Sequence, residues 1–357
     1  MGLLSYIQQR SSRERQNIMR VCVILLNWNG WENTIECLES LFQLAYPDFR
    51  VVVCDNASSD QSLEKIKEWA RGIRHAQFQN PCFSWLEAST CAKPIHTVEL
   101  TREQALSMKS NNNAPLTLIQ NGANLGFAGG NNVGLHYCLN DQDCEFFWLL
   151  NNDTVVHPDA LSALVRVVQQ QPRVGFCGSL NLSYYDPGEV QAQGGKNYNR
   201  WTARVYTPSL RIEELDSRPC RIHYINGAST LVTRALLESV GLMEESYFLY
   251  FEEMDWTMRA KGKFDLGYAR DSVIYHKEGA SIGTNCRRDN RSLLSDKYLS
   301  RNRVLFTRKF FPWALPSVLI SVVLSAASRL WSGDVERAKA MLSFMLEGLS
   351  TKIDARR

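Results

Sequence analysis

The chain has 357 residues, of which 45% are hydrophobic, and its formal net charge is +3 at pH 7. This length and composition predict about two domains, or one large α/β domain with an appendage, and they exclude a chain that is disordered throughout. The weak charge, without a basic stripe interleaved with aromatic residues, argues against a nucleic-acid partner.

The ten cysteines are scattered along the chain and form no CxxC pair. We therefore expect a reduced, cytosolic protein without structural zinc. The beginning of the chain, MGLLSYIQQRSSRER, has too short an apolar run for a signal peptide, and Tyr6 stands where a myristoylation motif has Ser or Thr. The main body of the chain is accordingly expected in the cytoplasm.

From Val21 onward, short β-rich runs alternate with amphipathic helical stretches. VCVILLNW precedes WENTIECLESLFQL, and RVVVCDNA precedes DQSLEKIKEWARG. Two further units follow, with strands at LTLIQN and FFWLLNND and with helices near 130–139 and from Pro158. Four strand–helix units predict an open, mainly parallel α/β sheet, whose ligands lie beyond the carboxyl ends of the strands.

Two segments depart from this scheme. Residues 81–114 have weak periodicity and end in a tract of Asn, so we interpret them as an insertion with one short helix over Thr101–Lys109. After Phe311 the chain turns apolar, and the stretch WALPSVLISVVLSAAS is shorter than the roughly 20 residues that span a bilayer comfortably. The predicted domains are an extension over 1–20, a main α/β domain over 21–311 and amphipathic helices over 312–357.

Three interpretations of the helices over 312–357 remain open. They pack on the core as a pair, they lie on a membrane surface with basic residues toward anionic headgroups, or one of them spans the membrane. The sequence alone does not choose among these interpretations.

Polar residues stand at the carboxyl end of every predicted strand. They are Asn27, Asn29, Asp55, Asn56, Asn121, Asn151, Asn152 and Asp153. A helix cap or an Asx turn explains each of them singly. Together they line one edge of the sheet, and Asp153 is a lone acid after a very apolar strand, so we expect a ligand at this edge.

The turn NGANLGFAGGNNVG is rich in Gly and Asn and leads into a helix. Its backbone amides are suited to approach a phosphate or a sugar, although a tight structural turn is an equally good interpretation. The turn does not spell GxGxxG, and the chain has no P-loop motif, so a nicotinamide or P-loop site is unsupported.

Six motifs in order resemble the family-two inverting glycosyltransferases, in particular the bacterial rhamnosyltransferases of cell-surface polysaccharide synthesis. The motifs are VILLNWNG, VVVCDNASSD, NLGFAGGNN, LLNNDTVVHPDAL, GASTLVTRALLESVGLMEESYFLYFEEMDWTMRAKG and YHKEGAS. The resemblance covers roughly Val21 to Arg308. It implies a GT-A fold, which is an α/β fold with a Rossmann-like mixed, mainly parallel sheet flanked by helices, here followed by a C-terminal helical appendage.

The resemblance also implies a nucleotide-sugar donor and Mn²⁺ or Mg²⁺ as cofactor. LLNNDT stands where the family has a DxD motif, so Asp153 matches the metal and diphosphate ligand, and Asn151 replaces the first acid. This replacement removes one anionic ligand and predicts weaker metal binding. His276 matches the family's late histidine, a second contact of the metal that stabilises the leaving diphosphate.

In FLYFEEMDWTMR, the second acid of the family motif is the catalytic base, which places Glu253 in that role with a side chain one methylene longer than the family's Asp. On a helix, Glu252 and Asp255 share a face while Glu253 points about 100° away. The alternative for these acids is stabilisation of the helix dipole. Asp255 and Trp256 are expected at the acceptor, with an Asp255–Arg259 ion pair and core packing of the Trp as the alternatives.

Further donor contacts follow from the resemblance, with Asp55 at the nucleobase or ribose. The expected donor-binding residues are Asn27, Asp55, Asn56, Asn124, Gly126, Asn131, Asn152, Asp153, Asn226 and Gly227. The expected reaction is transfer of a sugar, with rhamnose from dTDP-rhamnose as first candidate, to a saccharide or lipid-linked saccharide acceptor. A UDP-hexose or UDP-galactofuranose donor, and a scaffold that binds nucleotide sugar without turnover, are the alternatives.

The partners expected from the sequence are therefore the donor and the acceptor. A membrane surface, at the inner face of the cell membrane, and a second copy of the chain are left open as further partners.

Overall fold

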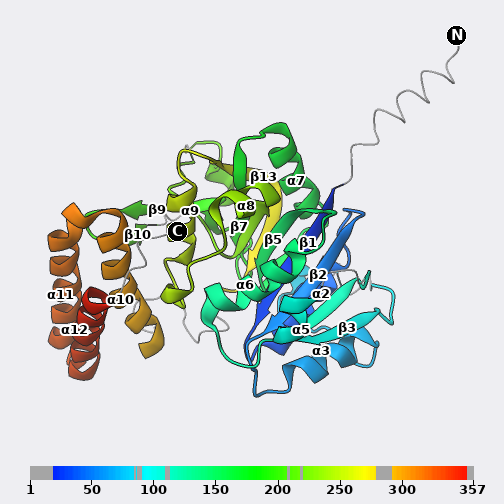
Figure 1. Ribbon diagram of the computed structural model, residues 1–357, viewed down its shortest axis with the longest axis horizontal. Helices are drawn as coiled ribbons and strands as arrows, with labels where there is room; N and C mark the ends of the chain where they lie inside the picture. Colours follow the sequence, from blue (N-terminus) through cyan, green and yellow to red (C-terminus); the bar gives the residue numbers. More distant parts are fainter. Residues whose placement is uncertain are drawn as a thin grey trace, which may run out of the picture.

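A computed structural model describes residues 19–83, 86, 91–108, 113–206, 210–217, 220–278 and 292–351. A mixed β-sheet lies at the centre, and a group of helices stands at one end of the longest axis (Figure 1). The predicted extension over 1–20 therefore falls almost wholly outside the described residues, as do residues 352–357 at the end of the predicted C-terminal helices.

One half of the sheet is parallel, as predicted. Its strands, in spatial order, are β5 (Cys144–Asn151), β1 (Arg20–Asn27), β2 (Phe49–Asp55), β4 (Leu116–Gln120) and β3 (Thr97–Thr101). Helices cover both faces, which is why the inner strands read as nearly continuous apolar runs rather than as alternating patterns. The sheet therefore divides the core into two layers.

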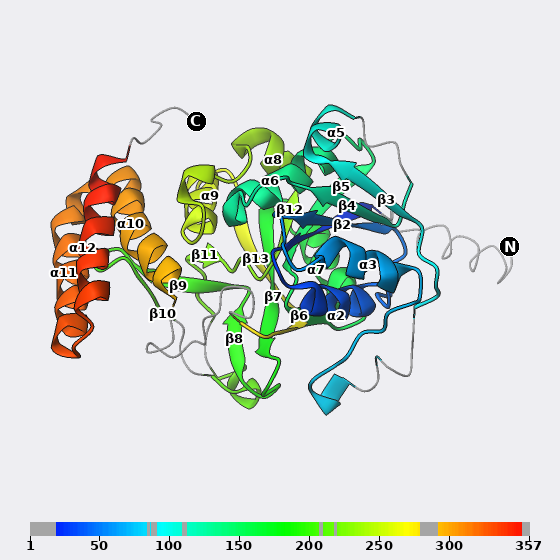
Figure 2. The same ribbon diagram turned by 90° about the horizontal axis from the view of Figure 1, so that it is seen from below.

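The helices of the two layers come from different parts of the chain. Figure 2 shows α2 (Trp31–Leu41), α3 (Ser62–Ala70) and α7 (Ala160–Gln170) on one face of the sheet. The other face carries the following helices: α5 (Arg102–Ser107), α6 (Gly126–Leu139), α8 (Arg234–Val240) and α9 (Glu252–Ala260). Because these helices cover the two faces of the sheet, the carboxyl ends of the parallel strands stay open for a site.

The other half of the sheet is largely antiparallel. β12 (Ser229–Thr233) lies antiparallel between β5 and β7 (Val174–Ser183), and β13 (Asp265–His276) runs parallel to β7. The remaining strands are β6 (Thr154–Val156), β8 (Val190–Gln193), β9 (Gly195–Asn199), β10 (Arg204–Tyr206) and β11 (Tyr224–Ile225). The prediction of a mixed sheet flanked by helices is thus confirmed.

The stretch 81–114 is only partly an insertion. β3 pairs with β4 in parallel register and forms the edge of the sheet. The predicted short helix is present as α5, and it begins at a capping box in which Thr101 and Gln104 bind each other's backbone amides. We attribute the missed strand to its length of five residues with one buried side chain, which leaves too little periodicity to recognise.

The predicted C-terminal helices are present as α11 (Leu315–Trp331) and α12 (Val335–Ser350), which pack with α10 (Leu293–Phe310). Arg308 on α10 donates to the carbonyl oxygens of Gly348 and Thr351 at 2.7 and 3.0 Å, which ties α12 to α10. Within the described part of the chain, one helical stretch, Pro312–Trp331, is long and apolar enough to cross a bilayer by length and composition.

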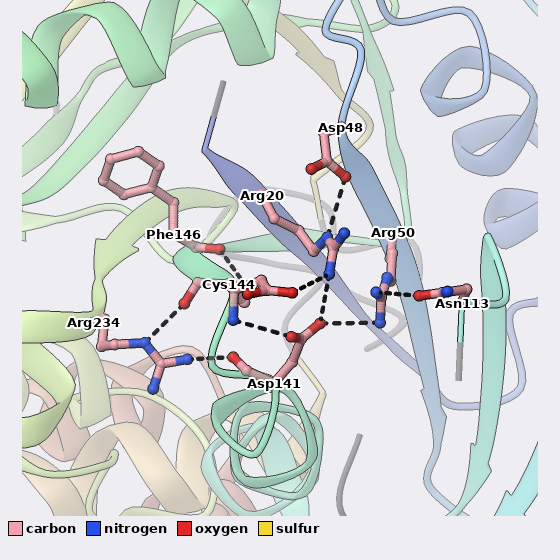
Figure 3. A network of polar contacts seen from close by, with 9 residues as sticks. Arg20, Asp48, Arg50, Asn113, Asp141, Cys144, Phe146 and Arg234 are labelled. Atoms are coloured by element: carbon pink, nitrogen blue, oxygen red, sulfur yellow. Dashed lines mark hydrogen bonds and ion pairs between the residues drawn. The ribbon is translucent and has the colours of Figure 1, made fainter. Parts of the chain in front are cut away.

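Charged side chains form a closed network at the amino ends of the parallel strands (Figure 3). Arg20 Nε lies 3.2 Å from Asp48 Oδ1, and Arg50 Nη1 lies 3.0 Å from Asp141 Oδ2. Arg234 donates to the carbonyl oxygens of Cys144 and Asp141 at 2.8 and 2.6 Å. This network satisfies its charges internally and fixes the starts of β1, β2 and β5.

Candidate active site

The carboxyl ends of β1, β2 and β5 open on a cavity of about 480 Å³. Many of the residues predicted for the site line it together. They are Asn56, Asn124, Gly126, Asn152, Asp153, Asn226, Gly227, Glu253 and His276. The structure therefore brings together residues that are separated by more than two hundred positions in the sequence.

Asp153 and His276 meet because β6 and β13 pair in antiparallel register, with His276 opposite Thr154. Asp153 Oδ1 lies 3.2 Å from His276 Nε2. The other ring nitrogen, Nδ1, lies 3.0 Å from Gln191 Oε1, while Nε2 of the same Gln donates to the His276 carbonyl oxygen at 3.1 Å. Gln191 thus offers an acceptor to Nδ1, which places the proton of the neutral imidazole there and leaves a lone pair on Nε2.

A lone pair on Nε2 facing a carboxylate oxygen at 3.2 Å is an arrangement of two acceptors that requires a proton or a cation. Burial would raise the pKa of Asp153, but its contact with His276 and the nearby Lys277 lower it below its usual value. One carboxylate and one imidazole fit a divalent cation that takes its other ligands from a diphosphate and water. Among the described residues, no group of three or more His, Cys, Asp and Glu side chains is placed to hold a metal alone.

Asn27 and Asp55 lie behind the cavity wall rather than in it. Asn27 Nδ2 donates to Asp55 Oδ1 at 2.7 Å, and Asn152 Nδ2 donates to Asn27 Oδ1 at 3.3 Å and to Thr34 Oγ1 at 2.9 Å. Both residues are buried and neither lines the cavity. Asn27 Oδ1 thus contacts Asn152, and the Asp55 carboxylate binds Asn27 and Ser58. The donor contacts expected of Asn27 and Asp55 stay a prediction.

Asn131 is likewise buried, and its Nδ2 donates to the Phe127 carbonyl oxygen within α6 at 2.9 Å. The start of this helix is the Gly-rich turn of the sequence. Gly126 has φ 72°, and a Cβ there would collide with the Phe248 carbonyl oxygen, which accepts from Phe127 N at 2.6 Å. Asn56 Nδ2 donates to the Gly126 carbonyl oxygen at 3.0 Å and ties the turn to the end of β2.

Glu252 and Glu253 both line the cavity. They are the first two residues of α9, and this end of the helix lies at the cavity. A side chain at Gly227 would collide with Glu253 Oε1, so the glycine makes room for this carboxylate. Burial raises the pKa of Glu253, while Lys196 and the Gly227 backbone oppose the rise. Burial and the neighbouring Glu253 raise the pKa of Glu252 well above its usual value, and its Oε2 has no hydrogen-bond partner among the described residues.

The acceptor contacts predicted for Asp255 and Trp256 are not supported. Asp255 is fully buried and accepts from Arg259 Nε at 2.7 Å and from Lys309 Nζ at 2.6 Å. Trp256 donates to the Gly241 carbonyl oxygen at 2.8 Å and borders a void of about 10 Å³. The alternatives, an ion pair with Arg259 and core packing, describe these residues, because their face of α9 points into the protein.

Sequence reasoning missed Lys196, which lines the cavity, and Gln191, whose Oε1 lies 3.0 Å from His276 Nδ1. Gln191 on β8 and Lys196 on β9 come from the antiparallel half of the sheet, where no motif signals a function. Helical spacing predicts that Glu252 shares a face with Asp255 rather than with Glu253. That rule fails here because Glu252 and Glu253 are the first two residues of α9, and no preceding turn of the helix covers them.

The Glycosyl transferase family 2 domain matches residues 22–81 and 97–241, more than half of the chain. The chain belongs to glycosyl transferase family 2. The resemblance found in the motifs is thereby confirmed, and residues 82–96, which the family domain skips, lie within the predicted insertion.

The relatives are distant. A low-salt glycan biosynthesis hexosyltransferase of Haloferax volcanii is 25% identical over 150 residues, which cover 40% of this chain and 45% of that protein. An N-acetylglucosaminyl-diphospho-decaprenol L-rhamnosyltransferase of Mycobacterium tuberculosis is 26% identical over 182 residues, 47% of this chain and 58% of that protein. The chain thus spans about half the length of the curated relatives it matches.

Several solved structures cover more than 90% of the chain. One is a mannosyltransferase from Pyrobaculum calidifontis in complex with GDP-mannose and Mn²⁺, 15% identical, with a TM-score of 0.49 over 98% of this chain and 95% of that one.

Proposed function

We propose that this member of glycosyl transferase family 2 transfers a sugar from a nucleoside-diphosphate donor to a saccharide acceptor with inversion at the anomeric carbon. One observation carries the proposal: Asp153, His276 and Glu253 line a single cavity at the carboxyl ends of the parallel strands. These are the residues that the family resemblance assigns to the leaving group and to the base.

Asp153 and His276 would hold a divalent cation, Mn²⁺ or Mg²⁺, that neutralises the charge of the departing diphosphate. The backbone of the Gly126 turn would lie along the donor, because Gly126 lines the cavity at the start of α6. Asn152, held by Thr34 and Asn27, keeps the turn after β5 rigid next to the cation ligands.

Glu253 would act as the base. The acceptor hydroxyl oxygen forms a bond to the anomeric carbon, the bond from that carbon to the diphosphate oxygen breaks, and the hydroxyl proton passes to the Glu253 carboxylate. The raised pKa of Glu253 makes its carboxylate a better proton acceptor than an exposed one, provided that the pH is high enough to ionise it.

Rhamnose from dTDP-rhamnose is the donor that we favour, on the strength of the motif order and of the mycobacterial relative. The name of that relative also supports a lipid-linked acceptor. A UDP-hexose or UDP-galactofuranose donor on the same fold is the second candidate, supported by the hexosyltransferase relative.

A panel of nucleotide sugars, each with and without Mn²⁺ or Mg²⁺, tests the proposal through release of the nucleoside diphosphate. We expect acceptor-dependent release with one donor, only when the metal is present. Binding of a donor without release under any condition, together with unchanged behaviour of Glu253→Gln, would favour a non-catalytic scaffold and contradict the proposal.

We further propose that the outward face of α11 lies on the cytoplasmic surface of a membrane, where a lipid-linked acceptor resides. Ile320, Leu324 and Trp331 are 60%, 63% and 95% exposed, and the sequence has no charge from residue 312 to 328. An exposed Trp at the end of an apolar helix is typical of the interface of a bilayer.

Liposome co-sedimentation tests this placement with the double variant Ile320→Glu, Leu324→Glu. Removing the whole helix pair is a poorer test, since α12 covers α10. We expect the double variant to lose sedimentation with anionic vesicles, while Leu106→Glu, an exposed apolar residue on α5, keeps it. A dimer in solution that the double variant dissociates would instead assign this face to a second copy of the chain.

A further inference from the structure

The loop between the 3₁₀ helix Glu245–Tyr247 and α9 has an unusual backbone. Phe248, Tyr250 and Phe251 have φ values of 64°, 67° and 79°. Non-glycine residues disfavour this left-handed region, and a bulky side chain makes it rarer still. Such a conformation persists only when surrounding contacts impose it, and it is common at functional sites.

This loop connects the two sides of the cavity. At its start, the Phe248 carbonyl oxygen accepts from Phe127 N in the Gly-rich turn at 2.6 Å. Along its length, Tyr250 and Phe251 line the cavity, and at its end the chain enters α9 at Glu252. The shape of the loop therefore sets both the donor turn and the direction of the two cavity-lining glutamates.

Asn302 on α10 holds the loop. It is completely buried, and its Nδ2 lies 2.9, 2.8 and 2.9 Å from the carbonyl oxygens of Tyr247, Leu249 and Tyr250. Because an amide group carries two N–H donors, these three carbonyl oxygens take up its full donor capacity. Arg301 Nη1 lies 2.9 Å from Asn302 Oδ1, which orients the amide with its nitrogen toward the loop.

Neighbouring side chains of α10 support the same contact. The Phe248 ring stacks on Tyr298 with centroids 4.8 Å apart, and Tyr250 Oη lies 3.1 Å from Ser295 Oγ. α10 stands between the α11–α12 pair and the loop region next to α9 (Figure 2). These contacts dock α10 on the loop, but among the described side chains only Asn302 binds the three carbonyl oxygens at its centre.

We propose that Asn302 is a positioning residue for sugar transfer, which imposes the left-handed loop that directs Glu252 and Glu253 into the cavity and closes the donor turn. The inference rests on the proposed function for its link to catalysis. Its structural part, the control of the loop by one amide, stands on the contacts alone. Asn302 itself does not line the cavity, so its role would be to position the loop rather than to bind substrate.

Asn302→Asp tests the proposal, because it keeps the shape and replaces the two donors with an acceptor facing three carbonyl oxygens. Thr307→Val is the matched control, since Thr307 is also fully buried on α10 and its Oγ1 donates only to the Arg303 carbonyl oxygen of the same helix among the described contacts. We expect kcat to fall about 10²-fold in Asn302→Asp, as for a small misplacement of catalytic groups, while KM for the donor changes only a few-fold.

A second readout is independent of turnover. Hydrogen exchange of the backbone amides over 248–253 should become faster in Asn302→Asp than in wild type and Thr307→Val.

The pH profile of the activity is a third readout. Its acid limb should move to lower pH in Asn302→Asp, because a displaced Glu253 is more exposed to water. If Asn302→Asp does not fold, hydrogen exchange and the pH profile are measured on Asn302→Ala, whose fold is checked by circular dichroism.

The outcomes separate the two proposals. The positioning role is overturned if the wild-type enzyme turns over and the Asn302 variants have the same kcat and the same hydrogen exchange as wild type. Equal losses in Thr307→Val also overturn it, since the effect would then be a general weakening of α10. A wild-type protein that turns over no nucleotide sugar contradicts the proposed function, while the exchange measurement still decides whether Asn302 controls the loop.

Discussion

The two ends of the parallel strands carry buried and partly buried polar side chains, which differ in whether their hydrogen bonds and charges find partners within the chain. At the amino ends, Arg20, Arg50 and Asp141 pair with one another and with neighbouring groups (Figure 3). At the carboxyl ends, Asp153 faces an imidazole nitrogen, and Glu252 Oε2 has no partner among the described residues.

This difference separates a structural network from a site. Buried polar groups in folded proteins are nearly always hydrogen-bonded, so unpartnered groups beside a cavity indicate a ligand-binding site. The amino-end network has its partners within the chain and should contribute to stability. The carboxyl-end groups should contribute to activity, even where they cost stability.

The largest expected effect is that of Asp153→Ala. It removes the anionic half of the cation site, and we expect a loss of about 10³-fold in kcat/KM, equivalent to about 4 kcal/mol. Metal-dependent binding of the donor should be lost as well, as measured by titration with Mn²⁺. Asp143→Ala, which removes an exposed acid at the amino ends, should keep full activity. Equal activities of the two variants would refute the distinction.

At the opposite end, Asp141→Ala should act on stability alone. It leaves Arg50 and one side of Arg20 without their carboxylate, and breaking such a buried pair costs about 3 kcal/mol. Urea denaturation measures this loss, with Asp143→Ala again as the control. The specific activity of the folded fraction should stay normal, and a selective loss of kcat would show that the network reaches the site.

Glu253→Gln should lower kcat by about 10²-fold, or about 2.7 kcal/mol, and leave donor binding intact. Because the pKa of Glu253 is raised and its charged form is the base, activity in wild type should fall as the pH drops through that pKa. The residual activity of Glu253→Gln should not show this fall at low pH. Full turnover in the variant would place the base elsewhere.

The smallest expected effect is a gain in the stability of the fold, in the variant Glu252→Gln. The folded-state pKa of Glu252 lies above its unfolded value, so the fold favours the protonated form, and wild type loses stability as the pH rises from the unfolded pKa of about 4.3. The variant should match wild type near pH 4 and exceed it at pH 8 by on the order of 1 kcal/mol. Scanning calorimetry across this range measures the difference, and equal Tm values at pH 8 would contradict it.

Local patterns predicted much of the fold and part of the site. The apolar runs and amphipathic stretches predicted the parallel half of the sheet, because burial on both faces leaves a direct trace in the sequence. The polar ends of these strands, with Asp153 among them, predicted the edge at which the cavity lies. Glu253 and His276 were found through motifs rather than through periodicity.

The remaining features depend on distant pairings. Whether Asn27 and Asp55 face a ligand or support Asn152 depends on contacts between strand ends, which leave no local pattern. The same holds for Gln191, which reaches His276 only because β8 and β13 both lie beside β7.

The amino-acid sequence by itself determined where the strands and helices form, since periodicity and turn residues act over a few positions. It also determined that polar groups end the strands. The tertiary structure alone decided which of these groups face the cavity and which are satisfied inside the protein, and it placed Asn302 against the loop before α9. The physical reason is that a hydrogen bond depends on the position of both partners, and for residues far apart in the chain only the packed fold sets that position.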